Sequence, residues 1–389
     1  SRGGPAVAAA GDATAPATVD GAAPRSPAQA SEAAPPLLQQ SPKDLAILGL
    51  LSNRGLLVVA AAAGVLQQTG FFDDPRRYAW LGTWLPDVLP DVLPNLLETF
   101  DPTAASFDLA RAAIFGAVAV AGFVVFTRLL SVGWVLMTLF GFTLRRRGKD
   151  FSTAYGLFTR VTATLPLRRL QLLHVERPFL ARRWGFHSVR VETAGGGASN
   201  DRQGPGAARL WLAPLVASEL AGDLVREAMP GIDPAGVDWR PLAPRAAGRV
   251  ARRNAVLTVL IGLAVALVSP LWSLLFLPLA GLAAWIGRRS VRRSAWGFDS
   301  GLDGDRRAIF FRSGSFDQQE SLVPIGKIQC VALAQTPFDR RWRMATLRVD
   351  TAGASAAGHR VEIPYLDVEI ARGLADELAD GVAETTFLW

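Results

Sequence analysis

The sequence is poor in the side chains that build disulfide frameworks, metal centres and highly charged surfaces. Among its 389 residues there is one cysteine, Cys330, which excludes an internal disulfide framework and a cysteine-based metal cluster. The three histidines, His174, His187 and His359, are too far apart for the spacing of a zinc site. Charged residues make up 19% of the chain, whereas soluble domains average about 25%. These shortages disfavour an ordinary soluble enzyme, and they lead us to expect no metal and no cofactor.

Hydrophobic residues are plentiful instead, at 50% of the chain, with a mean hydropathy of +0.23. Of the 41 basic residues, only Lys43, Lys149 and Lys327 are lysines. We attribute this arginine bias to a GC-rich genome, and we expect no nucleic-acid partner. The composition therefore predicts a membrane protein with soluble parts, and it does not identify a reaction.

The first 40 residues are dominated by Ala, Gly, Pro, Ser and Thr. Such a segment cannot bury enough surface to offset the entropy lost on ordering, so residues 1–40 are predicted to be disordered. The segment also lacks the compact apolar stretch of a signal peptide. Because the chain starts at Ser1 rather than at methionine, we expect it to be a fragment or a processed form.

Four apolar runs follow this segment, at residues 56–66, 112–144, 255–269 and 271–287. A transmembrane helix needs about 20 apolar residues, so the second run is long enough and the others are short. Arg128 interrupts the second run, and we expect its side chain to reach toward the membrane interface. The sequence predicts a membrane region over 44–144 with two spans and an external loop. A transmembrane or re-entrant helical hairpin around Pro270 is predicted over 254–287.

Charges beside these runs predict how the chain is oriented. Lys and Arg are enriched on the cytoplasmic side of membrane proteins. The segment 71–109 is acidic and suits the outer side. Three basic groups border the other ends of the runs: Arg145, Arg146, Arg147 and Lys149; Arg245, Arg249, Arg252 and Arg253; Arg288, Arg289, Arg292 and Arg293. We therefore predict a multi-pass membrane protein with its soluble parts in the cytoplasm.

An internal repeat is the most informative pattern in the chain. Residues 165–196 align without gaps with residues 323–354 at an offset of 158, and ten of these 32 positions are identical. Both copies contain an Arg-Arg-Trp triplet, at 182–184 and at 340–342. After a Gly-rich insertion in the first copy, the alignment resumes at an offset of 150, with Pro214 matching Pro364. The chain therefore carries two copies of one domain, each preceded by membrane helices.

Within each copy the pattern is that of strands followed by one helix. Residues 189–193 and 347–351 alternate between apolar and polar, as half-buried antiparallel strands do. Residues 215–229 and 366–379 close the copies as helices, the second with a four-residue apolar repeat. The predicted fold class is an α+β membrane protein. It has two small β-sheet or barrel domains, at 145–250 and 288–389, each with a C-terminal helix and separated by transmembrane helices.

Four motifs of the second copy resemble the bacterial pleckstrin-homology (PH) domain of YdbS/YdbT-like membrane proteins. They are Pro-Ile-Gly-Lys-Ile-Gln at 324–329, Pro-Phe-Asp-Arg-Arg-Trp at 337–342, Leu-Arg-Val-Asp-Thr-Ala-Gly at 347–353 and Ile-Pro-Tyr at 363–365. The first copy matches at 166–171, 182–184 and 191–196. The resemblance implies PH-like domains alternating with transmembrane pairs from about Asp44 onward. It also implies a bacterial plasma (inner) membrane as the location of the protein. Longer members of the family carry a further copy upstream, so we expect that an upstream domain is missing or truncated here.

The two Arg-Arg-Trp triplets are the candidate contact residues for a protein partner or for lipid: Arg182, Arg183, Trp184, Arg340, Arg341 and Trp342. One interpretation is a basic and aromatic edge that contacts anionic headgroups. The alternative, which we favour from the sequence, is a strand-start motif whose tryptophan packs into the sheet. Neither copy shows the dense Lys/Arg loop of phosphoinositide-binding PH domains, so we expect no selective headgroup binding.

No catalytic residue is predicted. No Ser/His/Asp or Cys/His set occurs within a matched segment, and Cys330 is expected to be a small buried side chain on a strand. The leading hypothesis is a non-catalytic, membrane-anchored scaffold whose partner is a protein, either a smaller PH-domain membrane protein or another copy of itself. Alternatives are a component of an export or envelope-defence system against membrane-active peptides, an anionic-lipid-binding module, and, least favoured, a membrane enzyme.

Overall fold

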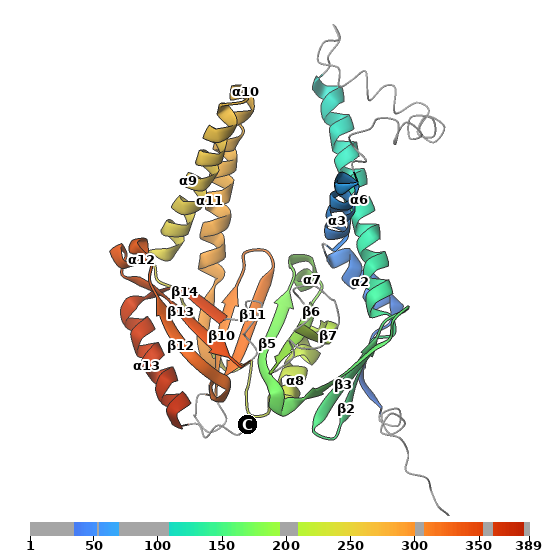
Figure 1. Ribbon diagram of the computed structural model, residues 1–389, viewed down its shortest axis with the longest axis vertical. Coiled ribbons are helices and arrows are strands. Elements are labelled where there is room, and N and C mark those ends of the chain that lie inside the picture. The colour runs from blue at the N-terminus through green and yellow to red at the C-terminus, as the bar shows by residue number, and fades with distance from the viewer. Residues whose placement is uncertain are drawn as a thin grey trace, which may run out of the picture. The chain divides into compact units, whose positions relative to one another are not determined.

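The computed structural model describes residues 35–52, 54–69, 109–194, 209–299, 307–352 and 361–384 (Figure 1). Within these ranges the first copy of the repeat contains antiparallel strands, a short helix and a closing helix. Its elements are β2 (Thr143–Arg147), β3 (Asp150–Tyr155), β4 (Val161–Pro166), the 3-10 turn η2 (Leu167–Arg169), β5 (Leu170–Arg177), α7 (Phe179–Arg183), β6 (Phe186–Thr193), β7 (Arg209–Ala217) and α8 (Ser218–Ala228).

The second copy has the same elements in the same order. They are β9 (Ala295–Asp299), β10 (Ala308–Ser313), β11 (Gln318–Pro324), the 3-10 turn η4 (Ile325–Lys327), β12 (Ile328–Ala334), α12 (Pro337–Arg341), β13 (Met344–Thr351), β14 (Val361–Asp367) and α13 (Val368–Glu384). The predicted strands at 189–193 and 347–351 lie within β6 and β13, and the predicted closing helices correspond to α8 and α13. The helix predicted from residue 215 begins three residues later, because 215–217 continue β7.

Apolar helices are inserted between the first two strands of each copy. In the first copy, β1 (Pro36–Gln39) pairs antiparallel with β2. Between them lie α2 (Pro42–Leu51), α3 (Arg54–Gln68) and α6 (Leu109–Leu139). In the second copy, β8 (Val237–Pro241) pairs antiparallel with β9, and α9 (Ala246–Ala266), α10 (Pro270–Ser273) and α11 (Phe276–Arg293) lie between them. Each group of apolar helices therefore starts and ends beside neighbouring strands.

The strands form three sheets, and one of them runs through both copies. Their orders are β1-β2-β3-β4, β7-β6-β5-β11-β10-β9-β8 and β12-β13-β14. The seven-stranded sheet is joined where β5 of the first copy pairs antiparallel with β11 of the second, with His174 opposite Ser321. We call this pairing the inter-copy joint. The sequence carries no sign that a single sheet would cross the two copies.

Both hydrophobic cores take side chains from both copies. The core under α8 includes Phe310 and Leu322 of the second copy. The core under α13 includes Leu172 of the first copy, packed with Ile309 and Val323 of the second. Leu172 is only 1% exposed. The two copies are therefore not independently packed domains, because each helps to bury the interior of the other.

Among the described residues, two helical segments are long and apolar enough to cross a membrane: Gly116–Leu139 in α6, and Pro270–Arg293, which covers α10 and α11. The helices α2 and α3 pass the same test only as a pair that is bent by 67°. Helices α9 and α11 pack along each other on either side of α10, as the hairpin prediction at Pro270 requires (Figure 1). The exposed apolar side chains near its tip, such as Leu267 at 87% and Val268 at 89%, suit contact with lipid tails.

Arg128 has backbone hydrogen-bond partners that the sequence did not suggest. Its Nη1 donates hydrogen bonds to the carbonyl oxygens of Leu50 and Ser52, at 3.0 and 2.9 Å. These carbonyls lie at the break between α2 and α3, where the helical hydrogen bonds end. The arginine therefore satisfies backbone groups that the bend leaves without helical partners.

Two further predictions need correction. Residues 36–39, assigned to the disordered segment 1–40, form strand β1, because Leu38 packs against the first core and β2 supplies backbone partners. Residues 237–241, assigned to the first domain, form β8, which pairs with β9 of the second copy. The remainder of the predicted disordered segment, residues 1–34, and the predicted external loop up to residue 108 lie outside the described residues.

Candidate functional site

The second Arg-Arg-Trp triplet lies at the end of α12. The helix begins after Thr336, whose hydroxyl accepts a hydrogen bond from the Asp339 backbone N–H at 3.2 Å. The Asp339 carboxylate accepts in return from the Thr336 backbone N–H at 2.8 Å, which completes a capping box. Arg340 and Arg341 are exposed on the last turn, and Trp342 caps the helix in a half-buried position. The triplet therefore precedes β13 on a short, well-capped helix rather than starting the strand.

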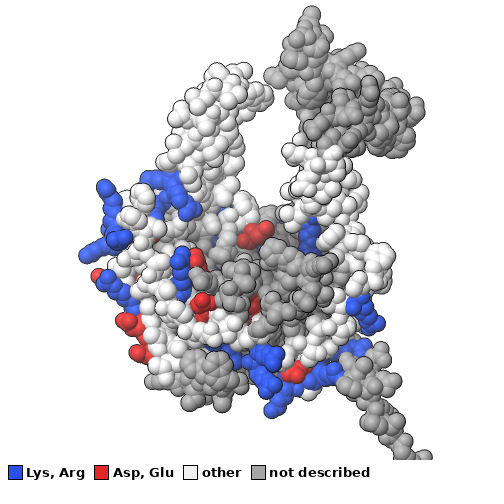
Figure 2. Space-filling model, in the orientation of Figure 1, with Lys and Arg blue, Asp and Glu red and all other residues white. Residues whose placement is uncertain are grey.

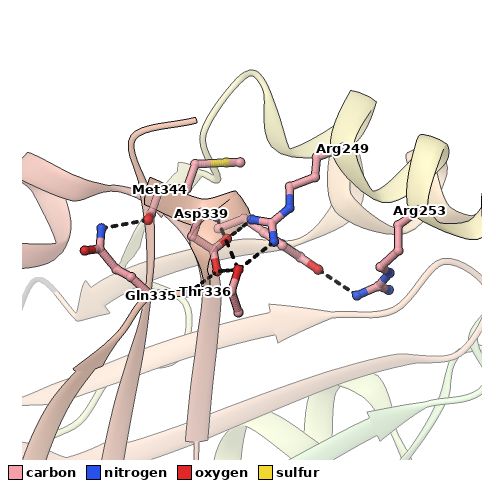
Figure 3. Close-up of polar contacts among 7 residues, drawn as sticks. Arg249, Arg253, Gln335, Thr336, Asp339 and Met344 are labelled. Carbon is pink, nitrogen blue, oxygen red and sulfur yellow. Dashed lines mark hydrogen bonds and ion pairs between the residues drawn. The ribbon is translucent and has the colours of Figure 1, made fainter. Parts of the chain in front are cut away.

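Arginines at the base of α9 hold α12 in place (Figure 3). Asp339 is 4% exposed and forms an ion pair with Arg249. Arg249 Nη2 also donates to Thr336 Oγ1 at 3.1 Å, and its guanidinium lies 5.3 Å from the Tyr365 ring centroid. Arg253 Nη1 donates to the Tyr365 hydroxyl at 3.1 Å (Figure 3). Part of the basic group that the sequence assigned to membrane orientation thus connects the strands of the second copy to the α9–α11 hairpin.

The first triplet lies in the same place on α7, but it is held differently. The position equivalent to Asp339 is Ala181, which is 2% exposed. It belongs to an apolar cluster formed with the bases of α2 and α6: Leu45, Leu48, Leu51, Val135, Leu139, Ala181 and Leu215. No side chain caps the N-terminus of α7. Apolar packing therefore replaces the ion pair of the second copy.

The interpretation that both tryptophans pack into the sheet is wrong. Trp184 is 59% exposed, because the residue before it ends α7 on the surface. The half-buried Trp342 packs on the Arg252 guanidinium, 4.9 Å from its ring centroid. Arg182 is half-buried, with its guanidinium 5.9 Å from the Phe179 ring, and Arg183 is exposed. Among the described contacts none joins the two triplets, so they form two separate surfaces.

An aromatic cluster lies at the base of α11, and the sequence analysis did not find it. Phe316, at the β10–β11 turn, lies 6.1 Å from Phe179 of α7 and 6.5 Å from Trp285 of α11, measured between ring centroids. The Arg289 guanidinium is 5.4 Å from Trp285 and 5.8 Å from Phe316. Each of the three rings is between 41% and 51% exposed. Aromatic rings beside arginines at the end of an apolar helix match the preferences of a membrane interface.

The distribution of charge agrees with this placement. The surface of the α9–α11 hairpin beyond its base is uncharged in Figure 2, and Lys and Arg gather where the hairpin meets the strands. Phe158, at the β3–β4 turn, occupies in the first copy the position of Phe316 and is 82% exposed. That turn also contacts the end of α6, since the backbone N–H of Leu157 donates to the Met137 carbonyl at 3.1 Å. In each copy, one hairpin turn thus presents a phenylalanine near the end of an apolar helix.

A Ser–His–Glu set lies within the inter-copy joint, and it combines residues of both copies instead of falling within one matched segment. His174 Nδ1 is 3.0 Å from Ser321 Oγ, and His174 Nε2 is 3.2 Å from Glu192 Oε1. Gln319 Nε2 also approaches His174 Nδ1 at 3.0 Å. The sequence could not reveal this set, because its members come from both copies and meet only through strand pairing. None of the three is more than 8% exposed, so the set links the strands and has no open approach for a substrate.

A basic cavity of about 590 Å³ opens beside the inter-copy joint. Its cationic lining comes from Arg146, Lys149, Arg168 and Lys327, with Asp150 as the one acid, over a mainly apolar floor. Lys149 and Asp150 belong to the hairpin of β2 and β3, where Lys149 follows the three arginines of β2. Lys327 Nζ donates to the Arg168 carbonyl at 2.9 Å, which ties the second copy to the first across the cavity. Such a lining suits an acidic ligand or an acidic side chain of a partner.

No group of three or more His, Cys, Asp or Glu is placed to hold a metal ion in the described part of the chain. Cys330 lies on β12, as a strand residue should, but it is exposed rather than buried. The reason is that β12 is an edge strand, whereas its equivalent β5 lies inside the seven-stranded sheet.

Comparison with known proteins agrees with these observations. The profile of the bacterial PH domain family matches residues 92–214 and 253–382, so each match includes the end of a membrane helical segment and the strands that follow it. UPF0699 transmembrane protein YdbT of Bacillus subtilis (strain 168) is 21% identical over 240 residues. These cover 62% of this chain and 46% of the relative, so the chain spans about half the length of that protein. No solved structure matches.

Neither the family description nor the name of the relative refers to an enzymatic activity. The two matches together cover more than half of the chain, and each contains one of the aligned repeat segments, 165–196 and 323–354. The family profile matches both strand-rich copies, and the described part of the chain has two helices long enough to cross a membrane. This chain belongs to the bacterial PH domain family.

Proposed function

We propose that this protein is a non-catalytic, membrane-anchored scaffold of a bacterial inner membrane, with both PH-like copies on the cytoplasmic face. The observation that carries the proposal is the inter-copy joint. Strands β5 and β11 share a backbone ladder over the register 318–322 against 173–177. Such a ladder cannot form across a bilayer, which supports one side of the membrane for both copies.

The position of the membrane helices supports the same arrangement. Each helical group leaves from one strand and returns to its antiparallel neighbour, β1 to β2 and β8 to β9. A segment that starts and ends on the same side crosses the membrane an even number of times or enters and returns. The basic groups that flank the helices favour the cytoplasm as that side.

Cysteine labelling tests this topology. In a Cys330→Ser background, Glu219→Cys and Glu369→Cys place single thiols at equivalent exposed positions on the first turns of α8 and α13. Pro90→Cys reports on the predicted external loop. We expect a membrane-impermeant maleimide to label Pro90→Cys in spheroplasts and the other two variants only in inside-out vesicles. Labelling of Glu219→Cys and Glu369→Cys from opposite sides would contradict the proposal.

Partner capture tests the scaffold role. The intact chain is cross-linked in its native membrane, purified and analysed by mass spectrometry. We expect a protein partner, either a smaller PH-domain membrane protein or a second copy of the chain. Recovery of no protein partner, together with tight and selective binding of a lipid headgroup, would overturn the scaffold in favour of a lipid-binding module.

Anionic-lipid binding is the second candidate, and exposure of the triplets favours it. Arg340 and Arg341 are exposed on α12, next to Phe338 at 69%. Each basic residue near an anionic surface contributes on the order of 1 kcal/mol, so Arg340→Ala with Arg341→Ala should weaken binding about tenfold or more. The full chain in neutral detergent is titrated with a brominated anionic lipid, and tryptophan quenching gives the midpoint. The effect should shrink as salt rises, because exposed charges are screened.

The matched control is the same titration with a brominated neutral lipid. Its midpoint should be the same for the unaltered chain and the double variant.

A further inference from the structure

We infer that β4 and β12 are complementary edges through which copies of this chain assemble, with β4 of one chain pairing antiparallel with β12 of the next. The inference rests on the proposed scaffold function and identifies its partner as a second copy of the chain. It starts from the repeat. β12 is the counterpart of β5, and β4 is the counterpart of β11, at the same offset of 158 residues.

The two strands that form the inter-copy joint therefore each have a counterpart at an edge. β4 ends the four-stranded sheet and β12 ends the three-stranded sheet. No strand within the described residues pairs with the outer side of either. The protein thus contains one completed joint of this kind, together with both halves of a second.

The composition of the two edges favours pairing. Natural proteins protect exposed sheet edges with charged residues, prolines or short strands. Between residues 161–165 of β4 and along the whole of β12 there is no charged residue and no proline; Pro166 ends β4. The other outer strands carry such protection, with Pro214 in β7 and Pro364 in β14. β8 contains charged residues and a proline, and β1 is four residues long.

Exposure along β12 shows what pairing would cover. Leu333 is 40% exposed, whereas its counterpart Val175 in β5 is 8% exposed. Cys330 is exposed, whereas its counterpart Leu172 is 1% exposed. Equivalent side chains are therefore buried on β5, which has β11 as a neighbour, and exposed on β12, which has no strand on that side among the described residues. A strand from another chain, placed as β11 is placed on β5, would remove this difference.

The internal register predicts the register between chains. His174 opposite Ser321 becomes Ala332 opposite Ala163, and Val175 opposite Glu320 becomes Leu333 opposite Thr162. Small and apolar residues therefore meet without bringing like charges together. The Ser–His–Glu set belongs to the inter-copy joint and has no counterpart on the two outer edges. Its hydrogen bonds therefore favour pairing of β5 with β11 over pairing of either strand with β4 or β12.

This contact joins two different surfaces, so it is heterologous and continues from chain to chain. With the membrane helices of every chain on one side, the products are a closed ring or a row in the plane of the membrane. Assembly of this kind gives the scaffold a repeating surface of basic cavities and Arg-Arg-Trp helices.

Cysteine cross-linking between differently tagged full-length chains tests the inference. One chain carries Ala163→Cys and the other Ala332→Cys, both with Cys330→Ser. We expect a disulfide-linked dimer under mild oxidation in membranes, since opposed residues of antiparallel strands lie 4.5–5.5 Å apart between their Cα atoms. The matched control pairs Ala163→Cys with Leu333→Cys, because adjacent residues point to opposite faces. Its dimer should form at least tenfold more slowly.

A charged residue placed on the edge of β12 gives a second test of the inference. Ala332→Arg places a charge on the exposed edge, and it should abolish species larger than one chain in native electrophoresis while leaving the melting temperature unchanged. Equal cross-linking of the test and control pairs, no cross-linking, or cross-linking of Ala332→Cys to a different protein would each overturn self-pairing. If cross-linking fails while partner capture recovers another protein, the scaffold function survives and only this inference is lost.

Discussion

The two Arg-Arg-Trp triplets have the same sequence, yet opposite chemistry holds their helices against the membrane segments. In the first copy, Ala181 and Leu215 pack against apolar side chains of α2 and α6. In the second, the equivalent residues are Asp339 and Tyr365, and both contact Arg249 at the base of α9. The comparison shows that the repeat preserves a backbone plan, while the neighbouring helix decides which side chains complete it.

The largest expected effect comes from giving the first copy the acid of the second. Ala181→Asp would bury a carboxylate in an apolar cluster without a cationic partner. We expect the free energy of unfolding to fall by about 4 kcal/mol or more, because an unpaired buried charge is strongly unfavourable. Denaturant unfolding of the full chain in detergent, followed by tryptophan fluorescence, measures the change. Ala181→Asn is the uncharged control of the same size as aspartate. A loss as large as that of the Asp variant would show that volume or polarity rather than charge is responsible.

The next largest effect comes from removing that acid from the second copy. Asp339→Ala leaves the mostly buried Arg249 guanidinium without its carboxylate and removes one half of the capping box. We expect a loss of about 3 kcal/mol, as for other broken buried ion pairs. The double variant Asp339→Ala with Arg249→Met should recover part of it in the same measurement. If the double variant is no more stable than Asp339→Ala, the unpaired charge is not the cause.

A pH-dependent difference between the copies should be smaller. Burial, together with the nearby Arg177 charge, lowers the pKa of His187 to about 4, and its counterpart in the second copy is the buried Ala345. Below pH 6.5 the unfolded chain binds a proton that the folded chain excludes. The free energy of unfolding therefore decreases as the pH is lowered, by up to about 1.4 kcal/mol per pH unit. Thermal melts between pH 7 and pH 5 measure the slope. His187→Ala should flatten it, and an unchanged slope would assign the dependence to other groups.

The smallest expected effect concerns the turn after each triplet. Gly185 has a φ of +73°, and its counterpart Arg343 has a φ of +53°, a left-handed conformation that is unfavourable for side chains other than glycine. Both residues use their carbonyls in the same way, accepting from the backbone N–H of Ser218 and Val368. Arg343→Gly should therefore raise the free energy of unfolding of the chain by roughly 1 kcal/mol. The control Gly185→Arg should lower the free energy of unfolding by a similar amount. A change of the opposite sign in either variant would contradict the turn argument.

The sequence was sufficient for the features that depend on local pattern. The offset of 158 residues identified the repeat, period-two alternation located β6 and β13, and Pro270 marked the break between α9 and α11. Each of these depends on residues that are close in the chain, where backbone geometry and apolar periodicity act directly. The family resemblance depended on the same short motifs.

Only the tertiary structure revealed where those elements meet. Cys330 and Leu172 have equivalent positions on equivalent strands, yet one is exposed and the other buried, because β5 has a neighbour that β12 lacks. The Ser–His–Glu set and the basic cavity are likewise assembled from both copies. Strand pairing between distant segments depends on edges and registers that no local pattern encodes. The sequence therefore determined the repeated parts of this protein, and the tertiary structure decided which edges joined them and which stayed open.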